Sequence, residues 1–206
     1  MGYITMTKEE VLKILDNYDG NEIKIKIEQD EKALKLVPLR DVELGKTICN
    51  GKYVVVEHFE NGTTGIIKKD AIKPGIQFGN TNEWNRSDLR KYLNTEYLKK
   101  ITSEFSEIEL HTVDMLSMDG DDFYGKCEDL VSVMTFDRWR KYHKYIGNAS
   151  CMEWLSTPNQ TKKHGDTFYV QFVCSDGFVR GGGCDWVGYG VRPFFILKSS
   201  NLVSVG

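Results

Sequence analysis

Two different periodicities follow one another in the first forty residues. Thr7-Lys8-Glu9-Glu10 has the spacing of a capping box, and the apolar residues of 11–15 recur at helical spacing, which predicts a helix over 7–18 that ends at Gly20. Residues 22–27 then alternate strictly between polar and apolar positions, and the alternation resumes at 34–36, which predicts a hairpin. We expect residues 1–40 to form a helix and β-hairpin attachment element beside a main domain over 41–206.

Short apolar runs separated by turn signals predict the strands of the main domain. Residues 53–57 form a β-rich run, and 65–67 return after Asn61-Gly62. Residues 168–173 and 178–180 flank a hairpin turn at 175–177, and Gly181-Gly182-Gly183 is expected to be a flexible tip or bulge. Residues 191–197 predict a closing strand.

Two short helical regions interrupt these strands. Ser87 is a good N-cap, and Leu89 and Leu93 are spaced to face inward, whereas Asn94-Thr95 is expected to end this helix and begin another. Thr135 is expected to cap a helix that runs to residue 145. Short strands mixed with a few helices indicate an α+β fold.

Composition excludes several classes of protein. The 206 residues are 40% hydrophobic, enough for a core that needs no metal or disulfide. No apolar run approaches the ~20 residues of a membrane span, so we expect no membrane insertion. The first residues lack the pattern of a secretory signal peptide. The net charge of −3 argues against nucleic acid as a partner, and the basic run over 138–144 is interpreted as a solvated helix face.

Cysteine and histidine spacing gives no support for a metal or a cofactor. The five cysteines show no C-x-x-C pair, and the four histidines no H-x-x-x-H pair. The acidic run over 119–122 lacks the ligand spacing of an EF-hand. Cys174 and Cys184 could face each other across a hairpin, and whether they pair stays open.

The segment over 181–189 is the strongest candidate for a site, because it combines glycines, aromatic rings and one carboxylate between two strands. Rings in such a loop can stack on a sugar or an apolar partner, and the carboxylate can accept hydrogen bonds from hydroxyls. The alternative is a glycine-bulged hairpin whose rings are tucked into the core. The predicted ligand-binding residues are Gly182, Gly183, Asp185, Trp186 and Tyr189.

Four motifs follow one another between about residues 44 and 198. The first is W-x-x-S-D-L-R-x-Y-L-N over 84–94, and the second is V-D-M-L-S over 113–117. The third is E-W-L-S-T-P over 153–158, and the fourth runs from Y-V at 169 through D-G at 176 to G-V-R-P-F at 190–194. In this order and spacing the motifs resemble an uncharacterised domain family of gut bacteria, prophages and phages, which usually has tryptophan where this chain has Glu153. The motif residues expected to be structural are Trp84, Ser87, Arg90, Trp154, Pro158, Arg192 and Pro193.

The resemblance implies a fold more than an activity. The family is distantly similar to the C-type-lectin-like fold, which also serves formylglycine-generating enzymes and phage receptor-binding proteins. We therefore expect a non-catalytic, phage- or prophage-encoded module that presents the 181–189 and 159–166 loops to a cell-surface glycan or protein. Residues 1–40 would attach it to other virion proteins, and homo-oligomers stay open.

Two alternatives come from other classes of protein. One is an accessory protein in the bacterial cytoplasm that binds a host protein or a small molecule. The other is an oxidase similar to the formylglycine-generating enzymes, which would require a reactive cysteine pair near Cys184.

Overall fold

The computed structural model describes residues 36–72, 76–105 and 107–205. The helix predicted over 7–18, and the hairpin up to residue 35, lie outside these ranges. The described chain is α+β with antiparallel strand pairs, as the sequence predicts. No helix in the described ranges has both the length and the apolar character that crossing a membrane requires.

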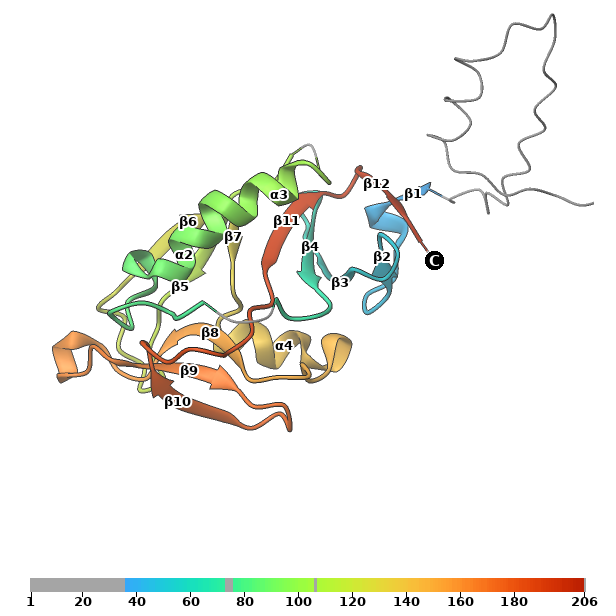
Figure 1. Cartoon of the computed structure of the whole chain (residues 1–206). Coiled ribbons are helices and arrows are strands. Elements are labelled where there is room, and N and C mark those ends of the chain that lie inside the picture. The colour runs from blue at the N-terminus through green and yellow to red at the C-terminus, as the bar shows by residue number, and fades with distance from the viewer. Residues whose placement is uncertain (1–35, 73–75, 106, 206) are drawn as a thin grey trace, which may run out of the picture. The chain divides into compact units, whose positions relative to one another are not determined.

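The strands and helices are short (Figure 1). The strands are β1 (Leu36–Pro38), β2 (Thr47–Ile48), β3 (Tyr53–His58), β4 (Thr63–Lys68), β5 (His111–Asp114), β6 (Lys126–Asp129), β7 (Val131–Ser132), β8 (Glu153–Pro158), β9 (Tyr169–Val173), β10 (Val179–Gly183), β11 (Phe194–Lys198) and β12 (Leu202–Ser204). The α-helices are α2 (Asp88–Tyr92), α3 (Leu98–Thr102) and α4 (Phe136–Ile146). Single 3-10 turns are η1 (Leu39–Asp41), η2 (Trp84–Arg86) and η4 (Lys162–His164), and η3 (Leu93–Tyr97) is a π-helical turn.

Four sheets make up the described domain. The largest has the order β2-β3-β4-β11-β7, and a second has the order β10-β9-β8. The pairs β5-β6 and β1-β12 form two-stranded sheets. The last strand, β12, therefore lies alongside the first described strand, β1 (Figure 1).

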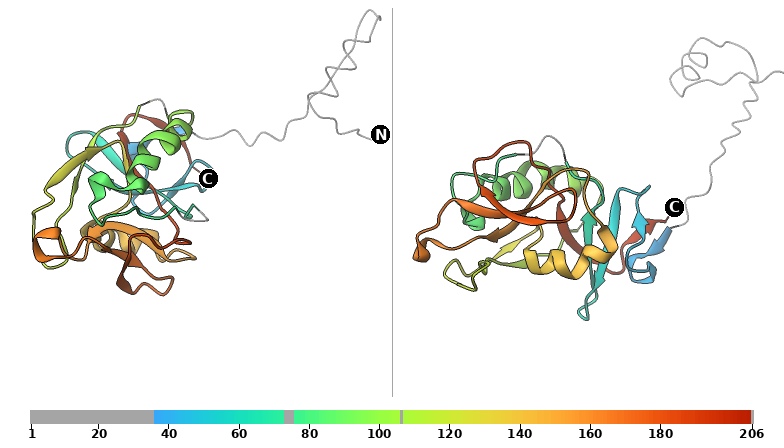
Figure 2. Two further views of the ribbon diagram at one scale, coloured as in Figure 1. Left: turned by 60° about the vertical axis from the view of Figure 1, so that its left-hand side comes forward. Right: turned by 90° about the horizontal axis from the view of Figure 1, so that it is seen from below.

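Alternation along the strands gives the five-stranded sheet two apolar faces. Val54, Val56 and Phe194 belong to one buried cluster, which includes residues of α4. Val55 and Phe195 belong to another, which includes residues of α2, η3 and α3. Side chains of a strand point alternately to opposite faces, so these residues place the two helical regions on opposite sides of the sheet (Figure 2).

Two predicted caps are confirmed. The Ser87 hydroxyl accepts a hydrogen bond from the Arg90 N–H at the start of α2. The Thr135 hydroxyl accepts one from the Arg138 N–H at the start of α4. Each satisfies one of the N–H groups that the first turn of a helix leaves without an internal partner.

The predicted helix break at Asn94-Thr95 is wrong. The chain stays helical over 88–102 through α2, η3 and α3, and the Thr95 hydroxyl donates to the Lys91 carbonyl oxygen instead of capping a new helix. Leu89, Leu93, Tyr97 and Ile101 recur every four residues, and each is at most 4% exposed. This buried stripe holds the helix through a residue pair of poor helical propensity.

Residues 36–40 pack with the main domain. Leu36–Pro38 pairs with β12, and the Leu39 side chain is fully buried. The domain expected over 41–206 therefore includes at least these five earlier residues in its fold.

Candidate binding site

The three consecutive glycines are part of a regular strand. Gly181, Gly182 and Gly183 lie in β10, opposite Gln171, Val170 and Tyr169 of β9. The prediction of a flexible tip or bulge is therefore wrong. The hairpin turn predicted at 175–177 is confirmed, and it is closed by a bond from the Gly177 N–H to the Cys174 carbonyl oxygen. The chain loops out only after residue 183.

Trp186 lies against two of these glycines. A turn closed by the Trp186 N–H and the Gly183 carbonyl oxygen (3.0 Å) folds the indole back over the strand. A Cβ added at Gly182 would lie 3.1 Å from Trp186 Cε3, and one added at Gly183 would lie 2.9 Å from Trp186 Nε1. Neither glycine has a positive φ, so the backbone conformation does not require glycine at these positions. Glycine is required there because a Cβ would prevent the close approach of the ring. The Trp186 side chain remains 46% exposed.

Tyr189 supports this ring from inside the domain. It is 6% exposed, and its ring centroid lies 4.5 Å from that of Trp154 and 4.7 Å from that of Phe172. It also meets Trp186 edge-on, with the centroids 6.0 Å apart. Tyr189 therefore follows the tucked-in alternative, and of the two loop aromatics only Trp186 presents its ring to solvent.

Two aromatic residues that the sequence analysis did not select extend this surface. Phe168 is 38% exposed, and its Cε1 lies 2.6 Å from where a Cβ of Gly183 would stand. Tyr169 is 48% exposed and meets Phe168 edge-on at 5.3 Å. We refer to Phe168, Tyr169 and Trp186 as the aromatic platform. One sequence signal could have identified the platform. It is the pair of adjacent aromatic residues at the start of a strand whose partner strand contains consecutive glycines.

Carboxylates stand next to the platform. Asp185 is exposed and directly precedes Trp186. The Asp166 Oδ1 accepts hydrogen bonds from the N–H groups of Phe168 (2.8 Å) and Tyr169 (3.0 Å), so this carboxylate is fixed to the platform backbone. Its Oδ2 is buried and has no hydrogen-bond partner in the described chain. An unmet buried acceptor is costly, and because this oxygen has no exposed surface, Asp185 is the carboxylate that a ligand can reach.

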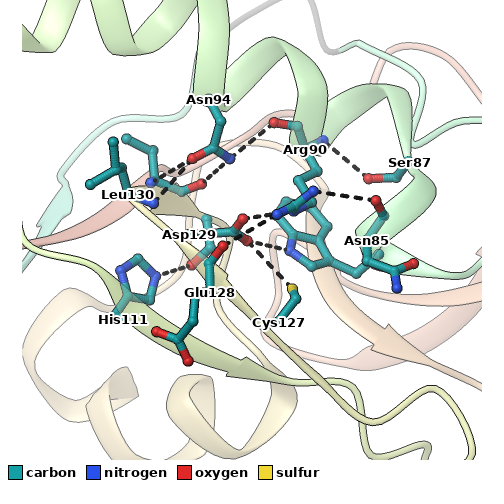
Figure 3. A network of polar contacts seen from close by, with 12 residues as sticks. Asn85, Ser87, Arg90, Asn94, His111, Cys127, Glu128, Asp129 and Leu130 are labelled. Atoms are coloured by element: carbon teal, nitrogen blue, oxygen red, sulfur yellow. Dashed lines mark hydrogen bonds and ion pairs between the residues drawn. The ribbon is translucent and has the colours of Figure 1, made fainter.

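The residues of the first motif form a polar network around Asp129 (Figure 3). The buried Trp84 donates from Nε1 to Asp129 Oδ2 (2.7 Å), and Arg90 donates from Nε to Asp129 Oδ1 (2.6 Å). Arg90 also donates to the carbonyl oxygens of Asn85 and Glu128. These contacts fasten η2 and the helix over 88–102 to β6, a connection that the sequence does not predict.

Asn94 extends the same network to the start of β7. Its Oδ1 accepts from the N–H groups of Leu130 and Val131 (both 3.1 Å), and its Nδ2 donates to the Val131 carbonyl oxygen (2.8 Å). The side chain thus acts as a short strand partner for 130–131. Sequence reasoning missed both Asn94 and Asp129 as members of this network, because the partners that join them to other elements lie 36–45 residues away in the chain.

Arg192 forms a buried ion pair with Glu153. Both side chains are 1% exposed, and Nε and Nη2 of Arg192 each donate to one oxygen of the Glu153 carboxylate. Arg192 also donates to the carbonyl oxygens of Ile146 and Gly147, where α4 ends. A carboxylate at position 153 thus neutralises a charge that would otherwise be buried unpaired.

The remaining motif residues are also in the interior. Trp154 is 1% exposed and donates from Nε1 to the Ile76 carbonyl oxygen. Pro158 ends β8 opposite Val170, and the Pro193 carbonyl oxygen accepts from the Lys68 N–H.

The acidic loop over 119–122 is closed by internal partners. Asp119 accepts from His164 Nδ1 (2.9 Å), and Asp121 accepts from the Thr161 hydroxyl, both residues lying in the 159–166 loop. These contacts anchor the 159–166 loop, which is therefore not free along its length. Within the described ranges, no group of three or more His, Cys, Asp or Glu side chains is arranged to hold a metal ion.

Cys174 and Cys184 lie at opposite ends of the β9–β10 hairpin. Cys174 bonds through its backbone to Phe178, and Cys184 to Phe168. A disulfide needs Cα atoms about 4.4–6.8 Å apart, which the length of the intervening strand excludes. Cys174 and Cys184 therefore do not form a pair with each other. Burial, followed by the charge of Asp185, raises the pKa of the Cys184 thiol to about 11.

A scan against protein-family models and searches of curated proteins and solved structures returned no match to this chain. What the chain does must therefore be argued from its own residues. Those residues define an α+β domain with a preorganised aromatic platform at one end of the β9–β10 hairpin.

Proposed function

We propose that this protein is a non-catalytic binding module that recognises a cell-surface carbohydrate through the aromatic platform. The observation that carries the proposal is the seating of Trp186, which is fixed against two glycines and still half exposed. A ring held in one place loses little conformational entropy when a ligand stacks on it. Its Nε1–H donates no hydrogen bond to any residue of the described ranges.

The polar groups around the platform suit a sugar better than an apolar partner. A pyranose presents C–H groups to an aromatic ring and hydroxyls at its edges. The exposed carboxylate of Asp185 is an acceptor for such hydroxyls. Few aromatic anchors with a small number of placed polar groups are typical of small-ligand sites.

We further propose that the domain adopts a C-type-lectin-like fold. Two features of the described chain support this. Its first and last strands pair, and a long segment between β4 and β11 carries the hairpin with the platform. Loops on such a scaffold vary without loss of the core, which suits a receptor-binding role in a phage or prophage particle. The class of fold alone does not imply the ligand.

Binding of purified protein to a glycan array and to intact bacterial cells tests this function. We expect the wild type to bind and Trp186→Ala to lose binding while its circular dichroism spectrum is unchanged. Phe178→Ala is the matched control, because Phe178 is 65% exposed at the other end of the same hairpin. Absence of wild-type binding, or equal loss of binding in both variants, would reject the platform as the site. Either result would favour the alternative of an accessory protein in the bacterial cytoplasm.

The proposed attachment role of the N-terminal region needs a cut at the right residue. Deleting residues 1–35 is expected to spare the fold and to remove the protein from purified phage particles. Deleting 1–40 would also remove Leu39 from the core and β1 from β12, so loss of assembly there would be ambiguous. A 1–35 deletion that still enters particles would refute the attachment role.

A further inference from the structure

A second pocket, of about 200 Å³, lies between the β3–β4 hairpin and the helix over 88–102. It shares no residue with the aromatic platform. Its polar lining consists of three lysines, three tyrosines and one glutamate. This combination differs sharply from the carboxylates beside Trp186.

The charges in this pocket are unbalanced. Lys52 pairs with Glu104 (Nζ to Oε1, 3.2 Å), which leaves the pocket with the charges of Lys68 and Lys100. Neither of these two lysines forms an ion pair with any residue in the described ranges. The local formal charge is therefore +2, in a chain whose net charge is −3. A pocket of this sign attracts an anion.

Tyrosine side chains lie next to these charges. Tyr53 and Lys68 are direct partners in the β3–β4 pair, and Lys68 Nζ lies 5.4 Å from the centre of the Tyr53 ring. The Tyr53 hydroxyl donates to Glu104 Oε2 (2.8 Å). Burial raises the pKa of both Tyr53 and Tyr97, so these hydroxyls stay protonated at neutral pH.

The π-helical turn η3 brings Tyr92 and Tyr97 to the same pocket. In a regular α-helix, residues five apart point in directions about 140° apart, since each residue turns the helix by about 100°. The i→i+5 bonding of a π-turn places them on one face instead, and both residues line this pocket. Such turns are rare and occur often at functional sites.

We propose that this pocket binds the phosphate group of a small phosphorylated compound. Lys68 and Lys100 supply the charge, the tyrosine rings contact the ester, and the pocket volume of about 200 Å³ suits a small phosphate ester. The negative charge of Glu104, which also lines the pocket, repels the anion. The charge of Glu104 should therefore weaken the binding, most strongly for more highly charged anions.

Titration calorimetry of the full-length protein tests this proposal, with glucose 6-phosphate, inorganic phosphate and glucose as probes. We expect glucose 6-phosphate to bind more tightly than inorganic phosphate, and glucose not to bind. The double variant Lys68→Met/Lys100→Met should weaken binding by at least about tenfold. Glu104→Gln should strengthen it several-fold, since it removes the opposing charge and keeps an acceptor for Tyr53.

Lys91→Met is the matched control, because Lys91 is an exposed lysine next to Tyr92 that does not line this pocket. Its affinity should equal that of the wild type. No saturable binding of either phosphate compound at millimolar concentration would overturn the proposal, as would unchanged affinity in a folded double variant. Equal weakening by Lys91→Met would show attraction by surface charge alone. Equal affinity for inorganic phosphate and the ester would overturn the assignment to an ester.

Discussion

Two tryptophans of this domain show what the same side chain does in two surroundings. Trp84 is fully buried, and its indole N–H is bonded to Asp129 within a network of charged groups. Trp186 is half exposed, lies on glycines and makes no hydrogen bond through its indole N–H within the described chain. The fold depends on Trp84 for packing and for a hydrogen bond, whereas it holds Trp186 in place and leaves half of that residue exposed. A side chain that the fold positions but does not use is the better candidate for binding.

Replacing each tryptophan by alanine tests this comparison with the largest expected effect. Trp84→Ala should lower the free energy of unfolding by about 3–5 kcal/mol, because it leaves a cavity and an unpaired Asp129 oxygen. Trp186→Ala should lower it by less, about 2 kcal/mol, since only about half of the ring is buried. Chemical denaturation monitored by circular dichroism measures both. Equal losses would remove the distinction on which the proposed function depends.

The next largest effect concerns pH and the region around Trp84. His111, opposite Asp129 in the β5–β6 pair, is buried, and desolvation together with the nearby Arg138 lowers its pKa to about 3. The unfolded chain, with a histidine pKa near 6.5, binds this proton more readily than the folded one. Stability from this group is therefore complete above about pH 6.5 and declines as the pH falls toward 3. At about pH 4.5 the loss should be about 2–3 kcal/mol.

His111→Gln supplies the comparison for this pH effect. Glutamine keeps a donor in reach of Ser132, which shares a hydrogen bond with His111 Nε2 (2.8 Å). The variant should lose less stability than the wild type between pH 7 and 4.5, when both are measured by urea denaturation. Identical pH profiles would show that His111 is not buried in its neutral form.

The sequence predicted the regular parts of this molecule better than its contacts. Local rules sufficed for the Ser87 and Thr135 caps and for the β3–β4 hairpin, because each depends on neighbours in the chain. They failed at Thr95, where a tertiary apolar stripe overrides weak helix propensity. The pairing of Glu153 with Arg192 joins residues 39 positions apart, and no local pattern encodes it.

The candidate site was only partly predicted, because several of its contacts also join residues that are distant in the sequence. Asp185, Trp186 and the glycines were selected as one loop, but the glycines form a strand that carries the tryptophan. Phe168 and Asp166 come from the other strand of the hairpin and its approach, so only the β9–β10 register brings them to Trp186. The tucked-in position of Tyr189 depends on Trp154 and Phe172, which the loop sequence does not contain.

A smaller effect on stability and binding is expected when Gly183 and Gly181, two glycines of β10, are each replaced by alanine. A Cβ at Gly183 would lie 2.6 Å from Phe168 and 2.9 Å from Trp186, whereas one at Gly181 would meet nothing closer than 3.5 Å. Gly183→Ala should therefore displace the platform rings, costing about 1–2 kcal/mol of stability and much of the carbohydrate binding. Gly181→Ala should change neither. Thermal unfolding and the glycan array measure the two effects, and a Gly183→Ala protein that binds normally would contradict the role assigned to this glycine.

The smallest expected difference is in the reactivity of two thiols, Cys127 in the network around Trp84 and Cys184 beside Trp186. Burial, followed by the charge of Asp129, raises the pKa of Cys127 to about 11, and burial followed by Asp185 raises that of Cys184 to a similar value. At pH 8 only about a thousandth of each would be thiolate, the form that reacts. Iodoacetamide should therefore label both slowly in the native protein and readily in urea, as peptide mass spectrometry would show. Fast native labelling of Cys184 alone would instead reveal a reactive thiol beside the platform, and would restore the oxidase as a candidate for the activity of this loop.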